Sequence, residues 1–234
     1  MLNIIYRDEL CVVINKPAGM LVHRTSIDHN ETVFAVQVLR DQIGQKVHPV
    51  HRLDKPTSGL LLFALNIEAL KALRSQFTEG TVEKTYVAVV RGYVGEKGTI
   101  DYPLKREIDA FSRSNADGSQ DAVTRYRCLA QTELPIPVGR YSTTRYSFVE
   151  LKPETGRKHQ LRRHMAHLRH PIVGDTRHGD GVHNRLFRKR LGIHRLLLHA
   201  QQLSFSHPSS DERITLTASF DELFREALEK TGLD

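Results

Sequence analysis

The stretch GLLLFAL at residues 59–65 constrains the fold most, because it is apolar without interruption. A run of this length that follows a turn predicts a strand buried on both faces of a sheet. The next residues predict a helix, since Asn66 can cap its start and Gly80 can close its end. Three apolar side chains share one face of that helix: Leu70, Leu73 and Phe77. Residues 59–80 therefore predict a buried strand followed by a helix that packs on it.

Strands and helices are interspersed along the rest of the chain. Strand patterns occupy residues 2–6, 10–17, 83–92, 122–130, 144–151, 195–206 and 213–218. Helical patterns occupy residues 32–44, which end at Gly44, and residues 158–170, which stop before Pro171. A last helix is expected to open with a capping box of Ser219 and Glu222. Because strands and helices do not alternate regularly, we expect an α+β fold with a mixed, mainly antiparallel sheet flanked by helices.

The length of 234 residues suits one domain, and we expect residues 1–234 to form it. Residues 105–121 are polar and rich in Asn, Gly and Ser, which indicates an exposed loop or insertion. No apolar stretch is long enough to cross a membrane, and the first residues do not look like a secretory signal. Two cysteines cannot form a disulfide framework, so a reducing cytoplasm is the expected location.

Positive charge is concentrated in two neighbouring parts of the chain. The net charge is +7, and residues 152–170 hold six Lys or Arg against one acid. Residues 183–195 hold five more Lys or Arg and no acid. These runs either form ordinary solvated faces or bind the phosphates of a polyanion.

The sequence lacks the motifs of nucleotide, dinucleotide and serine-hydrolase sites. His164, His167 and His170 are spaced by three residues, a spacing at which two metal ligands can share a helix face. No carboxylate lies between Glu154 and Asp175, and many arginines surround the histidines, which disfavours a cation. We therefore expect no metal and no cofactor, and expect these histidines to face phosphates or to pack as polar helix residues.

Asp54 lies in the segment HRLDKPTSG, directly before the buried strand. In an extended chain Arg52 and Asp54 point to the same side, so the arginine could keep the carboxylate ionised. A carboxylate held at the end of a rigid strand is placed for use as a nucleophile or a base. A structural Arg–Asp pair in a turn explains the same local pattern equally well.

Five segments together resemble the motifs of the pseudouridine synthases, in the branch that includes the ribosomal large-subunit enzymes and several transfer-RNA enzymes. HRLDKPTSGLLLFA at 51–64 resembles the central motif of that family. The other four segments follow the family's order: INKPAGMLVHR at 14–24, EKTYVAVVRG at 83–92, LKPETGRKHQLRRHMAHLRHPIVGD at 151–175 and RLLLHAQQLSF at 195–205. The chain begins at the first strands of the catalytic domain, so we expect no N-terminal accessory RNA-binding domain. Within the family, the motifs most resemble the members that isomerise the uridine at position 65 of certain tRNAs.

The resemblance implies a catalytic domain with an RNA-binding cleft, a base-flipping isomerisation of uridine to pseudouridine, and no cofactor. By resemblance Asp54 is the essential aspartate, which either attacks C1′ of the sugar or acts as a base at C2′. Arg52 matches the arginine that fills the space of the flipped base, and Tyr86 matches the tyrosine that stacks on the uracil. Arg162 matches the arginine that pairs with the catalytic carboxylate, and Leu198 matches a position that lines the pocket. Phosphate contacts are expected from six residues: Arg157, Lys158, Arg163, Arg188, Lys189 and Arg190.

The expected partner is tRNA, with no membrane and no obligate protein partner, and the chain is expected to be a monomer. Two other functions stay open. One is a pseudouridine synthase that acts on ribosomal RNA. The other is a non-catalytic RNA-binding protein that kept the scaffold.

Overall fold

The computed structural model describes residues 1–23, 33–107, 118–210 and 212–234, and these fall into two compact units. Unit 1 contains Met1–Lys84 and Ala200–Ser219, and unit 2 contains Thr85–Glu107, Ala116–His199 and Phe220–Asp234, within the described ranges. Strands β5 (Glu83–Arg91) and β11 (Leu198–Ser206) each run from one unit into the other. The organisation of residues 1–234 as one domain stays a prediction.

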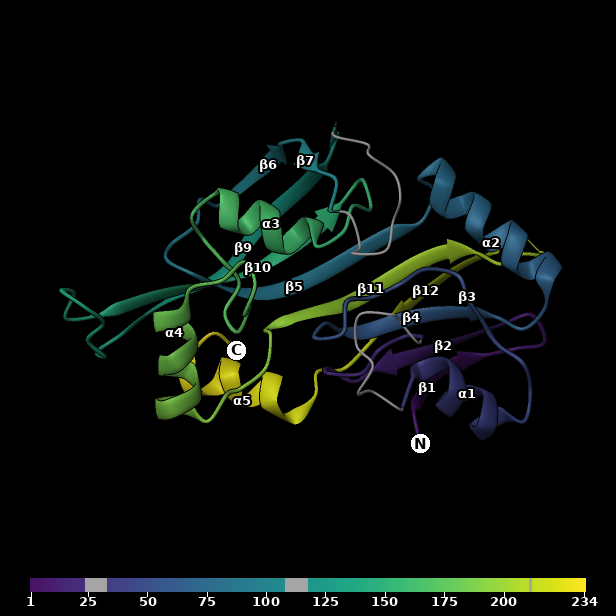
Figure 1. Cartoon of the computed structure of the whole chain (residues 1–234), viewed down its shortest axis with the longest axis horizontal. Coiled ribbons are helices and arrows are strands. Elements are labelled where there is room, and N and C mark those ends of the chain that lie inside the picture. Colours follow the sequence, from purple (N-terminus) through teal and green to yellow (C-terminus); the bar gives the residue numbers. More distant parts are fainter. Residues whose placement is uncertain (24–32, 108–117, 211) are drawn as a thin grey trace. The chain divides into compact units, whose positions relative to one another are not determined.

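Unit 1 is built on strands in the order β1 (Asn3–Arg7), β2 (Cys11–Lys16), β4 (Ser58–Ala64) and β11 (Figure 1). The short β3 (His48–Pro49) pairs with β4, and β12 (Arg213–Thr217) pairs with β11. The pairings of β1 with β2 and of β2 with β4 are antiparallel. Every residue of β4 is buried, which confirms the prediction from GLLLFAL.

Two helices flank the strands in the described residues of unit 1 (Figure 1). Helix α2 (Ile67–Glu79) begins and ends as predicted, because the Asn66 side chain accepts a hydrogen bond from the amide of Ala69 and Gly80 adopts a left-handed conformation. Its buried face packs on Val13 of β2 and Leu62 of β4. Helix α1 (Ala35–Ile43) ends at Gly44 as predicted but begins later than predicted, because Phe34 is extended; of the predicted range only residue 32 lies outside the described residues.

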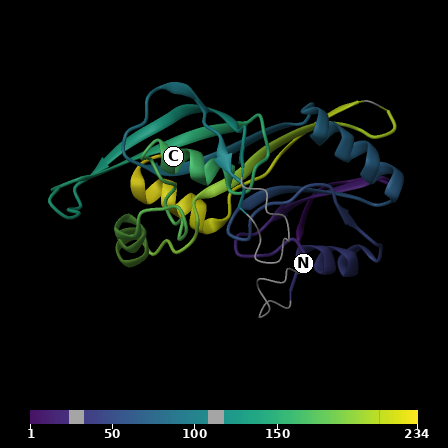
Figure 2. The same ribbon diagram turned by 45° about the horizontal axis from the view of Figure 1, so that its top comes forward.

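Unit 2 contains strands in the order β5, β10 (Thr144–Pro153), β9 (Val123–Leu134) and β6 (Lys97–Asp101). All of these pairs are antiparallel, which confirms the predicted α+β class with a mainly antiparallel sheet. Figures 1 and 2 both show β9 and β10 as a long ribbon whose connecting turn projects from the rest of the unit. The described ends of the predicted loop at 105–121 form a small ladder of β7 (Leu104–Lys105) and β8 (Ser119–Gln120), and residues 108–117 lie outside the described range.

Three α-helices lie in the described residues of unit 2: α3 (Gln160–His167), α4 (Gly181–Leu186) and α5 (Glu222–Thr231). A π-helical turn, η1 (Phe187–Leu191), follows α4 directly. The predicted capping box of α5 is wrong, because Asp221 rather than Ser219 caps the helix by accepting a hydrogen bond from the amide of Phe224. None of the helices in the described part of the chain is long and apolar enough to span a membrane.

Candidate active site

Asp54 lies in unit 1 at the turn that leads into β4. The amide of Thr57 donates to the carbonyl of Asp54 at 3.0 Å, and this bond closes the turn immediately before the strand begins. Leu53 is buried, Asp54 is partly buried and Arg52 is exposed. The carboxylate is therefore attached to the rigid end of a fully buried strand.

Gly59 fixes the position of that strand end. Its φ is +109°, and a Cβ atom at this position would lie 2.2 Å from the carbonyl oxygen of Ala200 in β11. Only glycine allows both this backbone conformation and this close approach of the two strands. The glycine in the predicted turn KPTSG thus serves strand packing next to Asp54.

The Lys16 side chain binds the backbone of Lys55, the residue that follows Asp54. Its side chain is fully buried, and Nζ donates to the carbonyls of Pro17, Met20 and Lys55 at 2.8, 2.9 and 3.2 Å. The amide of Gly19 also donates to the carbonyl of Lys55, at 2.9 Å. The segment at 14–24 and the central motif are therefore joined by hydrogen bonds. The sequence indicated a motif at 14–24 but not the role of Lys16. Its three acceptors are backbone carbonyls, which every residue has, so no residue type reveals them.

We expect Lys16→Met to lower the free energy of unfolding by about 2–4 kcal/mol, because three carbonyls lose a charged donor. Urea denaturation measures this loss. Lys46→Met is the matched control, because Lys46 is exposed in the same unit. Equal unfolding midpoints for the two variants would show that the ammonium does not hold the turn.

His51 belongs to the interior of unit 1. Its Nε2 accepts a hydrogen bond from the amide of Leu62 at 3.2 Å, and its ring stacks on Phe77 at a centroid distance of 4.8 Å. Burial lowers the pKa of His51 to about 4, and the positive charge of Lys84 adds to this effect. His51 is therefore neutral near pH 7, and Arg52 is the charged member of the doublet that precedes Asp54.

Tyr86 and Leu198 belong to one apolar cluster of unit 2. Tyr86 lies on β5 opposite Leu151 of β10, and it packs partly buried against that cluster. Leu198 is buried in the same cluster, together with Leu161 of α3. Arg162 directly follows Leu161. The predicted site residues Tyr86, Leu198 and Arg162 are therefore all positioned by this one apolar cluster.

Arg162 is buried in unit 2 and forms a two-pronged ion pair with Asp175. Nε lies 2.7 Å from Oδ2, and Nη2 lies 2.8 Å from Oδ1. The amides of Arg177 and His178 also donate to Oδ1, each at 2.9 Å. Burial alone would raise the pKa of Asp175, but these donors outweigh it and lower that pKa below its ordinary value. The sequence identified Arg162 but missed Asp175, and the pairing of Arg162 with Asp54 stays a prediction.

The family model for RNA pseudouridylate synthases matches residues 10–167. The chain belongs to the RNA pseudouridylate synthase family. That match contains Asp54, Tyr86 and Arg162 and ends before Asp175 and Leu198.

Whole-chain relatives agree with the family. The tRNA pseudouridine synthase C of Vibrio cholerae serotype O1 is 54% identical over 236 residues, which cover 99% of this chain and 96% of that protein. The protein of the same name from Yersinia pestis is 54% identical over 235 residues, covering 99% and 91%. The solved structure of human RNA Pseudouridylate Synthase Domain Containing 1 has a TM-score of 0.72 at 28% identity, covering 94% of this chain and 84% of that one.

The basic residues of this pseudouridylate synthase divide into exposed and buried ones. Arg157 is exposed, with Nε donating to the carbonyl of Asp121 at 2.9 Å, whereas Lys158 and Arg163 are partly buried. Exposed side chains on η1 come from three residues: Arg188, Lys189 and Arg190.

Arg195, the last residue of the basic run at 183–195, is not on a solvated or phosphate-binding face. It is buried and pairs with Asp221, and its Nε donates to the carbonyl of Leu196 at 2.9 Å. Burial lowers its pKa to about 10. Arg195 therefore holds the start of α5 in place.

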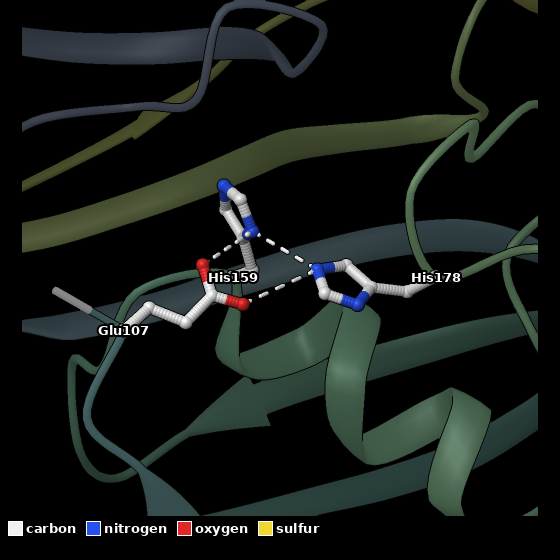
Figure 3. Close-up of side chains that lie close together, drawn as sticks. All are labelled: Glu107, His159 and His178. Carbon is white, nitrogen blue, oxygen red and sulfur yellow. Dashed lines mark hydrogen bonds and ion pairs between the residues drawn. The ribbon is translucent and has the colours of Figure 1, made fainter. Parts of the chain in front are cut away.

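The three histidines of the predicted helix at 158–170 have separate partners, and only His164 and His167 lie on α3. His164 is buried between Thr124 and the carbonyl of Tyr102, whereas His167 stacks on the Tyr102 ring at 3.6 Å. His170 bonds to the carbonyl of Arg91 at 2.8 Å. In the described part of the chain, the residues with suitable spacing for a metal are instead Glu107, His159 and His178 (Figure 3).

Proposed function

We propose that the chain is a tRNA pseudouridine synthase that isomerises the uridine at position 65 of tRNA. The observation that supports this most is the 54% identity over 99% of the chain to proteins named tRNA pseudouridine synthase C. In this reaction the bond between C1′ and N1 breaks, the uracil turns, and C5 bonds to C1′. The proton of C5 is lost and N1 gains one, so the reaction needs no oxidant or reductant.

Asp54 is the proposed catalytic carboxylate. It either attacks C1′ as a nucleophile or removes a proton at C2′ as a base, and both roles need an ionised carboxylate held in a fixed position. The Thr57–Asp54 bond and the buried Lys16 provide a fixed position within unit 1. A carboxylate on such a fixed turn meets the positional requirement of a catalytic group.

The target nucleotide has to leave its stack before a protein can reach it, which costs a few kcal/mol. We propose that Arg52 and Tyr86 offset this cost, Arg52 by filling the vacated space and Tyr86 by stacking on the uracil. Exposure of Arg52 and partial burial of Tyr86 are compatible with these roles. Leu198 is proposed to line the uracil pocket.

Arg162 is proposed to support the catalytic carboxylate. The remaining basic residues are proposed to contact phosphates: Arg157, Lys158, Arg163, Arg188, Lys189 and Arg190. Phosphate contacts position the RNA but do not read its sequence. We further propose that the enzyme acts as a monomer in the cytoplasm without an obligate protein partner.

Purified protein incubated with unmodified tRNA transcripts tests the proposed function. We expect pseudouridine at position 65 and no other position, read by chemical mapping at single-nucleotide resolution. A ribosomal RNA transcript in parallel tests the first alternative, and modification of it alone would replace the tRNA assignment. Tight tRNA binding without any product would instead favour the non-catalytic RNA-binding protein.

A further inference from the structure

Three segments of unit 2 bring metal-binding side chains together. Glu107 follows β7, His159 directly precedes α3, and His178 lies in the turn after Asp175. In Figure 3 the Glu107 carboxylate and one nitrogen of each imidazole point toward one another. The three donor atoms all lie within 4.8 Å of one another.

The distances among the donors match those of a small metal ion. His159 Nδ1 lies 3.0 Å from His178 Nε2 and 3.5 Å from Glu107 Oε2, whereas the 3.9 Å contact of His178 Nε2 is with the other carboxylate oxygen, Oε1. Ligands that surround Zn²⁺ tetrahedrally at 2.0–2.1 Å lie about 3.3 Å from one another. The observed distances lie on both sides of this value, so small side-chain rotations would suffice to place an ion between the donors.

The carboxylate offers a lone pair to such an ion. Glu107 Oε2 is buried, and within the part of the chain that the structure describes it has ion-pair contacts, such as Arg177 Nη2 at 3.1 Å, but no hydrogen bond of good geometry. The Glu107 side chain is only 17% exposed, so water reaches this oxygen poorly. A buried carboxylate oxygen that lacks a hydrogen bond gains from a cation.

The backbone also holds one ligand in an unusual position. His159 adopts a left-handed conformation with φ of 54°, which a non-glycine residue seldom adopts. In this position its Nδ1 bonds to His178 and lies next to Glu107, although α3 begins at the next residue.

We propose that Glu107, His159 and His178 bind one divalent transition-metal ion, with Zn²⁺ the best fit to two imidazoles and one carboxylate. Water or a phosphate oxygen would complete the coordination. The ion would join the end of β7, the start of α3 and the turn at 176–178.

Arg177 competes with the proposed ion. Its Nη2 lies 3.1 Å from Glu107 Oε2, but the side chain is 57% exposed and can turn into solvent. Arg162 is a weaker competitor, because Asp175 already neutralises it. Removing a ligand should therefore weaken Zn²⁺ binding, whereas removing the Arg177 charge should strengthen it.

Zn²⁺ binding to the full chain, purified without a histidine tag and stripped of metal with a chelator, tests the proposal. We expect one Zn²⁺ per chain by calorimetric titration and a higher thermal midpoint with Zn²⁺ than without. Glu107→Gln and His178→Gln should each weaken binding at least tenfold, whereas Arg177→Ala should tighten it roughly threefold or more, since a like charge is removed. Co²⁺ as a spectroscopic probe should give the strong visible absorption of a tetrahedral site.

His194→Gln is the matched control, because His194 is exposed and its Nδ1 bonds to the carbonyl of Gly192. Circular dichroism of each variant without metal confirms that it folds. Zn²⁺ binding that is absent from the wild type, or that persists in both ligand variants, would overturn the proposal. These readouts do not involve RNA, so they stand apart from the test of pseudouridine formation.

Discussion

Asp54→Asn is expected to reduce pseudouridine formation by about 10⁴-fold or more while leaving the fold and tRNA binding intact. Asparagine has nearly the same size as aspartate, and the turn bond from Thr57 goes to the backbone carbonyl rather than to the side chain. The amide, however, is neither a nucleophile nor a base of useful strength. Single-turnover assays on tRNA transcripts measure the rate, and filter binding measures the affinity.

Asp41→Asn provides the control for this experiment. Asp41 is an exposed carboxylate of unit 1 that pairs with Arg40 at 2.8 Å, so its loss should leave the rate unchanged. Comparable product from Asp54→Asn and from the control would exclude Asp54 as the catalytic group. A large loss of tRNA affinity in Asp54→Asn alone would instead give the carboxylate a role in RNA binding.

Arg162→Met is expected to lower the free energy of unfolding by about 3–5 kcal/mol, because it leaves the carboxylate of Asp175 buried without its cation. The side chains of Arg162 and Asp175 are only 6% and 1% exposed. Urea denaturation measures the loss. Adding Asp175→Asn to this variant removes the stranded charge and should restore part of the stability.

Arg125→Met is the matched control for the buried pair. Arg125 pairs with Glu154 at 2.5 Å, but the two side chains are 69% and 42% exposed, so the expected loss is below about 1 kcal/mol. If both single variants lose the same stability, the buried pair contributes no more than a surface one.

The sign of the pH dependence follows from the lowered pKa of Asp175. A carboxyl group whose pKa is lower in the folded state stabilises the protein above its ordinary pKa of about 3.9. That contribution is lost as the pH falls through the lower, folded-state pKa. The double variant Arg162→Met with Asp175→Asn should therefore lose less stability between about pH 4 and pH 2 than the wild type.

Local signals predicted most of the secondary structure. The uninterrupted apolar run gave β4, and the Asn66 and Gly80 signals gave both ends of α2, because each depends on neighbouring residues alone. The cap of α5 was misassigned because Ser219 and Asp221 are both good caps, and only the observed start of the helix at Glu222 selects Asp221. Helix α4 was missed because it is short, with a capping Asp180 and no long apolar period.

Partners that are distant in the sequence could not be predicted in the same way. The basic run at 183–195 looks uniform, yet Arg195 is buried because Asp221 lies beside it in the fold. The i, i+3 spacing of His164, His167 and His170 singled out histidines whose side chains have separate partners in the fold. The converging histidines are His159 and His178, which are 19 residues apart, and the carboxylate beside them is that of Glu107, which follows β7.

The strand order of unit 1 has a consequence for how the chain folds during synthesis. Strand β4 is apolar throughout and lies between β2 and β11, but β11 follows β4 by more than 130 residues. At about 5–20 residues per second, the part of the β4 edge beside β11 that is not covered by β3 would wait roughly 7–30 s for β11 to leave the ribosome. We therefore expect nascent chains that stop before residue 198 to expose this edge, to recruit chaperones and to aggregate without them.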